Sequence, residues 1–220
     1  MTVWCAAYVG IGSNLSDPAA QVLRSFDDLA RIDGVRVEAR SALYRTRPFG
    51  PVVQDDFVNA VAGVLTTLTP PALLAQLRAL ELARGRVRSE RWGPRILDLD
   101  LLVQGKHRLD TPELALPHPG IAERNFVLYP LRDIAPDLDI PGVGRVAQLA
   151  QRVDATGHQG GADRLDAIAP QQRLQLLQAG QVGGAELRKG EPQAAVDLQI
   201  NAHGAEPVAA PVVTGAGRTR

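Results

Sequence analysis

Residues 56–81 read DFVNAVAGVLTTLTPPALLAQLRALE, a β-branched run followed by two prolines and a leucine-rich segment. Apolar residues alternate over 56–68, a pattern that predicts a strand. Pro70 and Pro71 suit the first turn of a helix, where the N–H that proline lacks would have no partner within the helix. The leucines that follow recur at helical spacing. The stretch therefore predicts a strand joined directly to a helix.

The rest of the first 131 residues extends this order. The other predicted elements are strands at 3–11, 35–44 and 95–103, a helix at 20–32 that Ser16 or Asp17 can cap, and a helical turn followed by an apolar segment within 117–131. Strand, helix, two strands, helix and strand is the order of an α+β sandwich with two helices on one face of a mainly antiparallel sheet. We therefore predict a ferredoxin-like βαββαβ fold with added elements, whose other sheet face can hold ligands.

The composition changes near residue 155. All nine aromatic residues lie within the first 129 positions, and the chain from 156 onward is rich in Ala, Gly and Gln. Such a segment buries too little apolar area to offset the entropy lost on ordering. We expect a folded domain over 1–155 and, over 156–220, a tail without sheet structure that is disordered or weakly helical.

Charge and cysteine content exclude several classes of protein. The 24 basic and 24 acidic residues leave a net charge of zero, so no overall field attracts nucleic acid or anionic lipid. The single Cys5 excludes an intrachain disulfide, and four scattered histidines without a Cys-x-x-Cys argue against structural zinc. The N-terminal stretch has neither a basic signal region nor the length of a membrane span. We expect a cytoplasmic protein that binds neither nucleic acid nor membrane.

The strongest chemical signal lies in residues 84–100, RGRVRSERWGPRILDLD. Asp98 and Asp100 are two positions apart on a predicted strand, so their carboxylates project from the same face while Leu97, Leu99 and Leu101 point into the core. Neighbouring carboxylates repel unless a cation lies between them, and Mg²⁺ commonly binds one or two carboxylates together with substrate phosphates. The pair predicts a nucleotide and metal site, although an isolated Asp-x-Asp is more often a solvated strand face.

A cluster of arginines precedes this acidic pair, at Arg84, Arg86, Arg88, Arg91 and Arg95. Guanidinium groups are planar, bidentate partners for phosphate oxygens. Phosphoryl transfer needs mainly positioning, metal ions and cationic clamps, which these residue types supply. The motifs of other phosphate sites are missing, because Gly10-x-Gly12 lacks a third glycine and Gly105-Lys106 is not followed by Ser or Thr.

A second group of residues suits a flat heterocycle. Phe57 and Asn59 also lie two apart on a strand, so one face offers an aromatic surface beside an amide that donates and accepts hydrogen bonds. Trp92 lies in a polar loop, where a role confined to the core is harder to argue and stacking on a ligand is an alternative. Core packing is the alternative for Phe57, and Phe126 shares that ambiguity.

The order and spacing of these blocks resemble those of the 6-hydroxymethyl-7,8-dihydropterin pyrophosphokinases of folate biosynthesis, over roughly residues 3–155. The matching blocks are Gly12-Ser13-Asn14, Tyr44-Arg45-Thr46 through Asn59, Gly85 through Arg95, Leu97-Asp98-Leu99-Asp100, Pro117-His118-Pro119 and Arg124-Asn125-Phe126. The resemblance implies transfer of the β,γ-diphosphate of ATP to the hydroxymethyl group of the reduced pterin, with release of AMP.

The resemblance also implies roles for individual residues. Asp98 and Asp100 would bind two Mg²⁺ ions and, with Arg86 and Arg95, take part in catalysis. The ATP-binding residues would be Arg86, Arg88, Arg91, Arg95, His118 and Arg124. The pterin pocket would comprise Thr46, Pro48, Phe49, Phe57, Asn59, Trp92 and Phe126, with the ring between Phe49 and Phe126 and read by Asn59. The chain departs from the best-known members in two places. The loop at residues 84–90 is one residue shorter, and Arg47 stands where a proline is common.

Two other functions stay open at this point. An RNA-binding module of ferredoxin-like fold would use the sheet aromatics for base stacking, although Asp98 and Asp100 would repel a phosphate backbone. Another two-metal nucleotidyl or phosphoryl transferase could act on a different heterocycle. We expect small-molecule substrates and a monomer, with association with other folate enzymes left open.

Overall fold

The computed structural model describes residues 3–48, 53–85, 93–156 and 162–165, with only the backbone given for 154–156. All of them lie in the first of the two units into which the chain divides, Met1–Gln181. Among these residues no helix is long and apolar enough to cross a membrane.

An antiparallel sheet runs in the order β10-β3-β4-β1-β5, and β2 pairs with a further stretch of β4. Its strands are β1 (Cys5–Ser13), β2 (Val35–Arg40), β3 (Leu43–Thr46), β4 (Phe57–Thr66), β5 (Asp98–Gln104) and β10 (Ala162–Leu165). Two short ladders lie apart from it, β6 (Leu109–Asp110) with β7 (Ala115–Leu116) and β8 (Asp139–Ile140) with β9 (Gly144–Arg145). The prediction of an α and β fold with an antiparallel sheet is confirmed.

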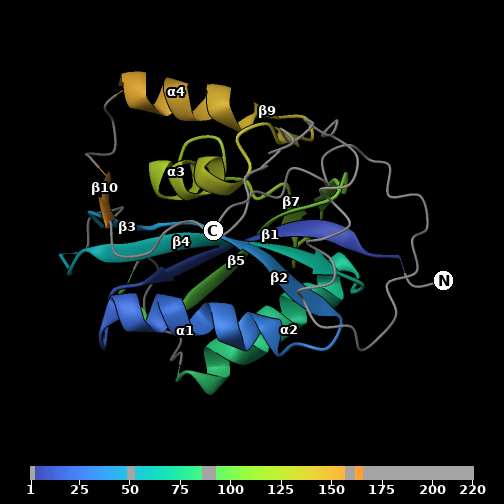
Figure 1. Cartoon of the computed structure of the whole chain (residues 1–220), viewed down its shortest axis with the longest axis horizontal. Helices are drawn as coiled ribbons and strands as arrows, with labels where there is room; N and C mark the ends of the chain where they lie inside the picture. The colour runs from blue at the N-terminus through green and yellow to red at the C-terminus, as the bar shows by residue number, and fades with distance from the viewer. Residues whose placement is uncertain (1–2, 49–52, 86–92, 157–161, 166–220) are drawn as a thin grey trace, which may run out of the picture. The chain divides into compact units, whose positions relative to one another are not determined.

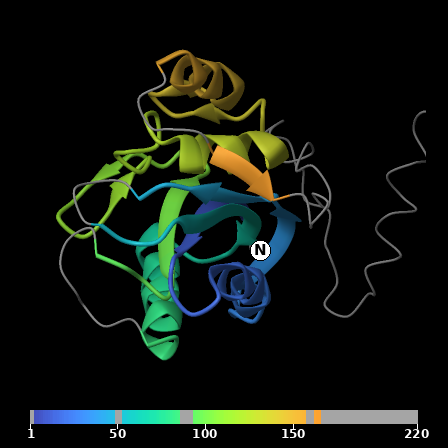
Figure 2. The same ribbon diagram turned by 90° about the vertical axis from the view of Figure 1, so that its left-hand side faces the viewer.

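Helices cover both faces of this sheet. Figure 1 shows α1 (Pro18–Ala30) and α2 (Pro70–Ala83) against one face and α3 (Asn125–Ile134) over the other, with α4 (Val146–Thr156) beyond α3. Figure 2 shows the same layering from the side. The sequence analysis predicted α1 and α2, but it predicted only a helical turn where the ten-residue α3 forms.

Each face of the sheet has its own apolar core, because neighbouring side chains on a strand point to opposite sides. The core beneath α1 and α2 includes Phe26, Leu29, Leu73, Leu77 and Leu99. The core beneath α3 and α4 includes Tyr8, Val61, Leu102, Leu128 and Leu131. The central strands β1, β4 and β5 supply residues to both cores, so they are buried on both sides over most of their length.

The N-termini of α1 and α2 follow the known residue preferences for helix caps and first turns. The Asp17 side chain accepts a hydrogen bond from the Ala20 N–H at 3.4 Å and caps α1, which confirms one of the two predicted caps. Asp17 adopts a φ of 60°, a left-handed conformation that Asp tolerates better than most residues. Pro70 and Pro71 occupy the first turn of α2, as their sequence position predicts.

The predicted strand at 35–44 is in fact two strands, β2 and β3, and the break falls at Ser41. The Ser41 Oγ accepts a hydrogen bond from the Val61 N–H at 2.9 Å, in the place of a ladder carbonyl. The next N–H, of Ala42, leaves the ladder and donates to the Asp133 carboxylate on α3. A long-range pair of side-chain hydrogen bonds therefore interrupts a segment whose local pattern is that of a single strand.

The prediction that no sheet forms after residue 156 is wrong for Ala162–Leu165. This segment is β10, which pairs antiparallel with β3, and Leu165 packs against the core beneath α1 and α2. Strand pairing satisfies backbone groups and depends little on average composition, so four residues can pair within an otherwise Ala- and Gly-rich stretch. The division into a domain over 1–155 and a tail over 156–220 stays a prediction.

Replacing Leu77 by Ala should lower the free energy of unfolding by about 2–5 kcal/mol, because its fully buried side chain would leave a cavity in the core. Leu82→Ala is the matched control on the same helix, since Leu82 is 67% exposed and should change stability by less than about 0.5 kcal/mol. Urea unfolding of both variants measures the change. Equal losses in the free energy of unfolding would contradict the assignment of Leu77 to the buried face of α2 and of Leu82 to its exposed face.

Candidate active site

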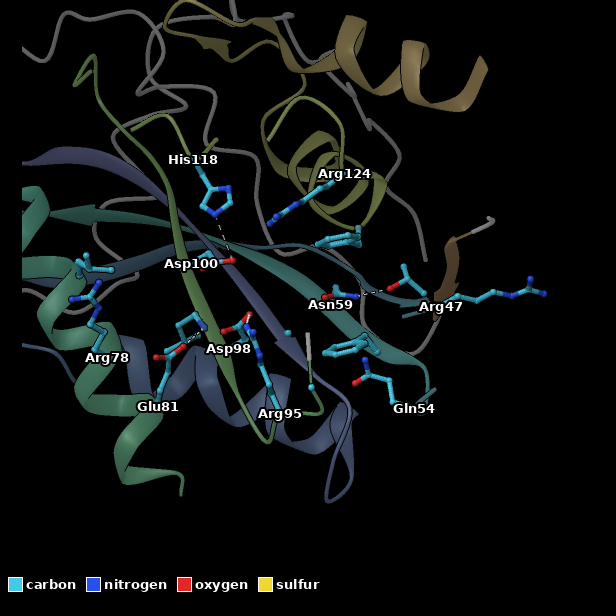
Figure 3. A pocket seen from close by; sticks show the side chains of 17 residues that line it. Arg47, Gln54, Asn59, Arg78, Glu81, Arg95, Asp98, Asp100, His118 and Arg124 are labelled. Atoms are coloured by element: carbon cyan, nitrogen blue, oxygen red, sulfur yellow. Dashed lines mark hydrogen bonds and ion pairs between the residues drawn. The ribbon is translucent and has the colours of Figure 1, made fainter. Parts of the chain in front are cut away.

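A cavity of about 420 Å³ lies where β1, β4 and β5 run beside α2 and the start of α3 (Figure 3). Its walls combine carboxylates, cationic side chains and aromatic rings. The lining residues are Gly12, Thr46, Arg47, Gln54, Phe57, Asn59, Leu74, Arg78, Glu81, Gly93, Arg95, Asp98, Leu99, Asp100, His118, Arg124 and Phe126.

Most of the predicted site residues that the structure describes meet in this cavity. Nine of them line it, namely Thr46, Phe57, Asn59, Arg95, Asp98, Asp100, His118, Arg124 and Phe126. Pro48 is described but is not among the lining residues. The other predicted residues, Phe49, Arg86, Arg88, Arg91 and Trp92, lie outside the described residues. The fold therefore brings together predicted site residues from three segments that are distant in the sequence, around β4, β5 and the start of α3.

The acidic pair has the geometry that the strand period predicts. Asp98 and Asp100 project into the cavity from β5, while Leu99 between them is 3% exposed and packs in the core beneath α1 and α2. The Arg95 Nη1 lies 2.6 Å from the Asp98 Oδ2, at the start of the strand. Figure 3 shows this pair directly beside Asp100.

The Asp100 carboxyl holds its proton unusually strongly. Burial and, to a lesser extent, the neighbouring Asp98 charge raise its pKa to about 7, against the opposing effect of the Arg124 guanidinium. The two carboxylates thus repel as the sequence analysis expected. A cation between them would relieve this repulsion and lower the pKa.

His118 faces Asp100 as a neutral imidazole. Burial and the Arg124 charge lower the pKa of His118 to about 4, so the ring is uncharged at pH 7. Its Nδ1 accepts a hydrogen bond from the Gly120 N–H at 3.2 Å, which places the ring proton on Nε2. The Nε2 lies 4.0 Å from the Asp100 Oδ2, so His118 presents an N–H donor to the carboxylate side of the cavity.

A buried carboxylate on α2 fixes the backbone between the two aspartates. Glu81 is 3% exposed, and its Oε1 accepts a hydrogen bond from the Leu99 N–H at 2.7 Å. Because Leu99 separates Asp98 from Asp100, this bond holds the segment that sets their spacing. The sequence analysis did not name Glu81 as a site residue, although a carboxylate in line with Leu73 and Leu77 on the apolar stripe of a helix was a usable signal.

The other end of the cavity presents an amide and two aromatic rings. The Asn59 Nδ2 donates to the Thr46 Oγ1 at 2.8 Å, which fixes the orientation of the amide. A Cβ on Gly12 would lie 3.0 Å from the Asn59 Oδ1, so glycine at this position leaves room for that oxygen. Phe57 lines the cavity from the same strand as Asn59, and the Arg124 guanidinium lies 5.7 Å from the Phe126 ring centroid.

The sequence analysis misassigned one arginine of the predicted cluster and missed some residues that line the cavity. Arg84 does not line the cavity and instead forms an ion pair with Asp28 on α1. Conversely, Gln54, Leu74 and Arg78 line the cavity without having been predicted, and no local pattern distinguishes them from surface residues.

The donor set suits a hard divalent cation that also binds phosphate. Asp98 and Asp100 offer oxygen ligands on one strand face, and Arg95 and Arg124 lie beside them to balance added negative charge. Within the described part of the chain, no group of three or more His, Cys, Asp or Glu side chains forms a complete metal site. Mg²⁺ held by two carboxylates would take its remaining ligands from phosphate oxygens and water.

Comparison with known proteins agrees with this geometry. The family model of 7,8-dihydro-6-hydroxymethylpterin-pyrophosphokinase matches residues 8–136, more than half of the chain. The chain belongs to this family. A relative from Pseudomonas aeruginosa, named 2-amino-4-hydroxy-6-hydroxymethyldihydropteridine pyrophosphokinase, is 50% identical over 134 residues, which cover 61% of this chain and 83% of the relative. A relative of the same name from Methylorubrum extorquens is 46% identical over 151 residues, covering 69% and 95%.

Solved structures of the pyrophosphokinase family share the fold. The wild-type HPPK-DHPS of Plasmodium falciparum, crystallised with pteroate, aligns with a TM-score of 0.57 at 15% identity. The alignment covers 74% of this chain and 46% of that one, so the chain spans less than half the length of the solved protein.

Asp100→Asn should stabilise the metal-free protein at pH 8. The folded-state pKa of about 7 lies above the ordinary value of 3.8, so the folded state binds more protons than the unfolded state between these values and loses stability as the pH rises through them. The variant should therefore gain on the order of 1 kcal/mol, allowing for partial exposure of the carboxylate, or about 2–4 °C in Tm.

Thermal unfolding in a chelator at pH 4 and pH 8 measures this effect. The gain should fall to a small part of its pH 8 value at pH 4, where Asp100 is protonated in the folded state and somewhat less than half protonated in the unfolded state. Asp110→Asn, which alters an exposed carboxylate on β6, is the control. An equal gain for Asp100→Asn at both pH values would contradict the assigned pKa.

Proposed function

We propose that the cavity transfers the β,γ-diphosphate of ATP to the hydroxymethyl group of 6-hydroxymethyl-7,8-dihydropterin and releases AMP. The observation that carries this proposal is the placement of Asp98 and Asp100 between cationic side chains at one end of the cavity and Asn59 with two aromatic rings at the other. Membership of the pyrophosphokinase family and the printed names of the relatives support the same reaction, which belongs to folate biosynthesis.

Asp98 and Asp100 would hold two Mg²⁺ ions against the triphosphate. When bound, the ions would neutralise phosphate charge and align the β-phosphorus for in-line displacement. The chain's own contribution is to keep both carboxylates on one strand face, with Glu81 bonded to the amide between them. Arg95, paired with Asp98, would add a charge-assisted hydrogen bond to the developing negative charge.

The remaining residues would orient the two substrates. His118 would donate its Nε2 proton to a phosphate oxygen, and Arg124 would contribute positive charge from the start of α3. Asn59, held by Thr46, would read the polar edge of the pterin, and Phe57 and Phe126 would contact the ring. The hydroxymethyl oxygen then bonds to the β-phosphorus, the bond from that phosphorus to the α,β-bridging oxygen breaks, and the hydroxyl proton passes to water.

The finer expectations from the sequence belong to this proposal as well. With β2 and β3 counted as one interrupted strand, the order β3-β4-β1-β5 supports the expected ferredoxin-like sandwich. Arg86, Arg88 and Arg91 as ATP ligands, and Phe49, Trp92 and Pro48 in the pterin pocket, stay predictions. So do the monomeric state, the cytoplasmic location and association with other folate enzymes.

Asp98→Asn and Asp100→Asn should each lower AMP release by about 10³-fold or more, because each removes a metal ligand whose charge an amide does not replace. The assay follows AMP formed from ATP and Mg²⁺ with and without the hydroxymethyl dihydropterin. Asp110→Asn should retain wild-type activity, since this carboxylate is exposed on β6. Full activity in either active-site variant would overturn the two-metal assignment.

Asn59→Ala should raise the KM for the pterin by about 10–100-fold, the cost of leaving buried polar groups of the ligand without partners. The KM for ATP should stay within about threefold of the wild-type value, because β1 separates β4, which carries Asn59, from β5, which carries Asp98 and Asp100. Thr46→Val should have a smaller effect of the same kind, because it frees the amide to rotate. Equal increases in both KM values would contradict the role of Asn59 in pterin recognition.

A further inference from the structure

Asn14 follows directly on β1 and is nearly fully buried, at 2% exposure, although none of the roles above uses it. Its Nδ2 donates to the Gln54 Oε1 at 2.9 Å and to the Asp55 carbonyl oxygen at 3.2 Å. Its Oδ1 accepts from the Arg95 N–H at 2.7 Å, and its backbone N–H donates to the Arg95 carbonyl at 3.1 Å. One side chain therefore bonds two segments that are far apart in the sequence.

These two segments lead into opposite ends of the cavity. Gln54 and Asp55 directly precede β4, which carries Phe57 and Asn59, and Gln54 itself lines the cavity. Arg95 precedes β5 and forms the ion pair with Asp98. The heterocycle end and the phosphate end of the cavity thus share one hydrogen-bonded anchor.

The chemistry of the bonds requires an amide at this position. The two bonds to Gln54 and Asp55 need a donor, while the bond from the Arg95 N–H needs an acceptor, and a carboxamide supplies both from one short side chain. Asp has the same shape but no donor, and Ala has neither group. The site is also enclosed, so each lost partner leaves buried polar groups unsatisfied.

We propose that Asn14 is a positioning residue that sets the distance between the pterin end and the phosphate end of the site. It acts through the backbone of Arg95 on one side and through Gln54 and Asp55 on the other, without touching either substrate. The proposal rests on the proposed pyrophosphate transfer, since it assigns a part in aligning the hydroxymethyl group with the β-phosphorus. Loss of such alignment lowers the rate steeply, because a shift of about 1 Å can cost about 10²-fold.

The first experiment compares Asn14→Ala with Gln104→Ala. Gln104 is also a buried amide, 1% exposed, which donates to the Leu68 carbonyl at 2.8 Å from the other end of β5 and does not line the cavity. Both variants should lose stability in thermal unfolding. Only Asn14→Ala should lower kcat, by about 10²-fold, with Gln104→Ala within about threefold of wild type.

The second experiment uses Asn14→Asp, which keeps the shape of the side chain. An Asp oxygen can still accept from the Arg95 N–H, and the Gln54 amide can rotate to donate to it. The carboxylate and the Asp55 carbonyl oxygen would then repel, so the segment before β4 should shift while Arg95 stays in place. We expect an increase of at least about tenfold in the KM for the pterin, with the KM for ATP within about threefold.

The outcomes separate this proposal from the proposed function. If wild-type protein forms no AMP from ATP and the pterin, the proposed function is wrong. Positioning by Asn14 is then tested by hydrogen exchange at the Arg95 amide. Exchange should be faster than in wild type for Asn14→Ala and as slow as in wild type for Asn14→Asp. If wild-type protein is active, kinetic constants of Asn14→Ala that match those of Gln104→Ala overturn the proposal. Equal increases in the KM values for the pterin and for ATP in Asn14→Asp would also overturn the proposal. If Asn14→Ala does not fold, the isosteric Asn14→Asp variant is sufficient to test it.

Discussion

The repulsion between the Asp98 and Asp100 carboxylates is the interaction on which the rest of the site depends. Leu99 anchors β5 in the core, and Glu81 holds its N–H, so the two charges cannot move apart along the strand. The fold instead surrounds them with Arg95 and other cationic or neutral donors. In the proposed function, relief of this repulsion would contribute to the affinity for a cation and for the phosphates that accompany it.

The cavity occupies the part of a sheet face that the second core leaves uncovered. Along this face each central strand is apolar at one end and polar or glycine at the other. The apolar ends are Tyr8 on β1, Val61 on β4 and Leu102 on β5, and the other ends are Gly12, Asn59 and Asp100. The same strands therefore support packing beneath α3 and chemistry beyond it, so the site rests on rigid backbone rather than on loops alone.

Local periodicity predicted those parts of the site that share one strand. Asp98 with Asp100, and Phe57 with Asn59, could be paired because side chains two apart on a strand share a face. Contacts between distant segments were missed, such as the Ser41 bond that divides β2 from β3 and the bond from Glu81 to β5. Arg84 shows the converse error, since its sequence neighbours suggested phosphate whereas its partner in space is Asp28.

The pairing of β10 with β3 bears on where the chain can be cut. Ala162 lies opposite Thr46, so β10 occupies backbone groups of β3 right up to the residue that orients the Asn59 amide. A fragment ending at residue 155 would leave the outer N–H and C=O groups of β3 open to water or to the strand of another molecule. Shortening the chain there would move the open edge of the sheet from the four-residue β10 to β3, beside the ligand cavity.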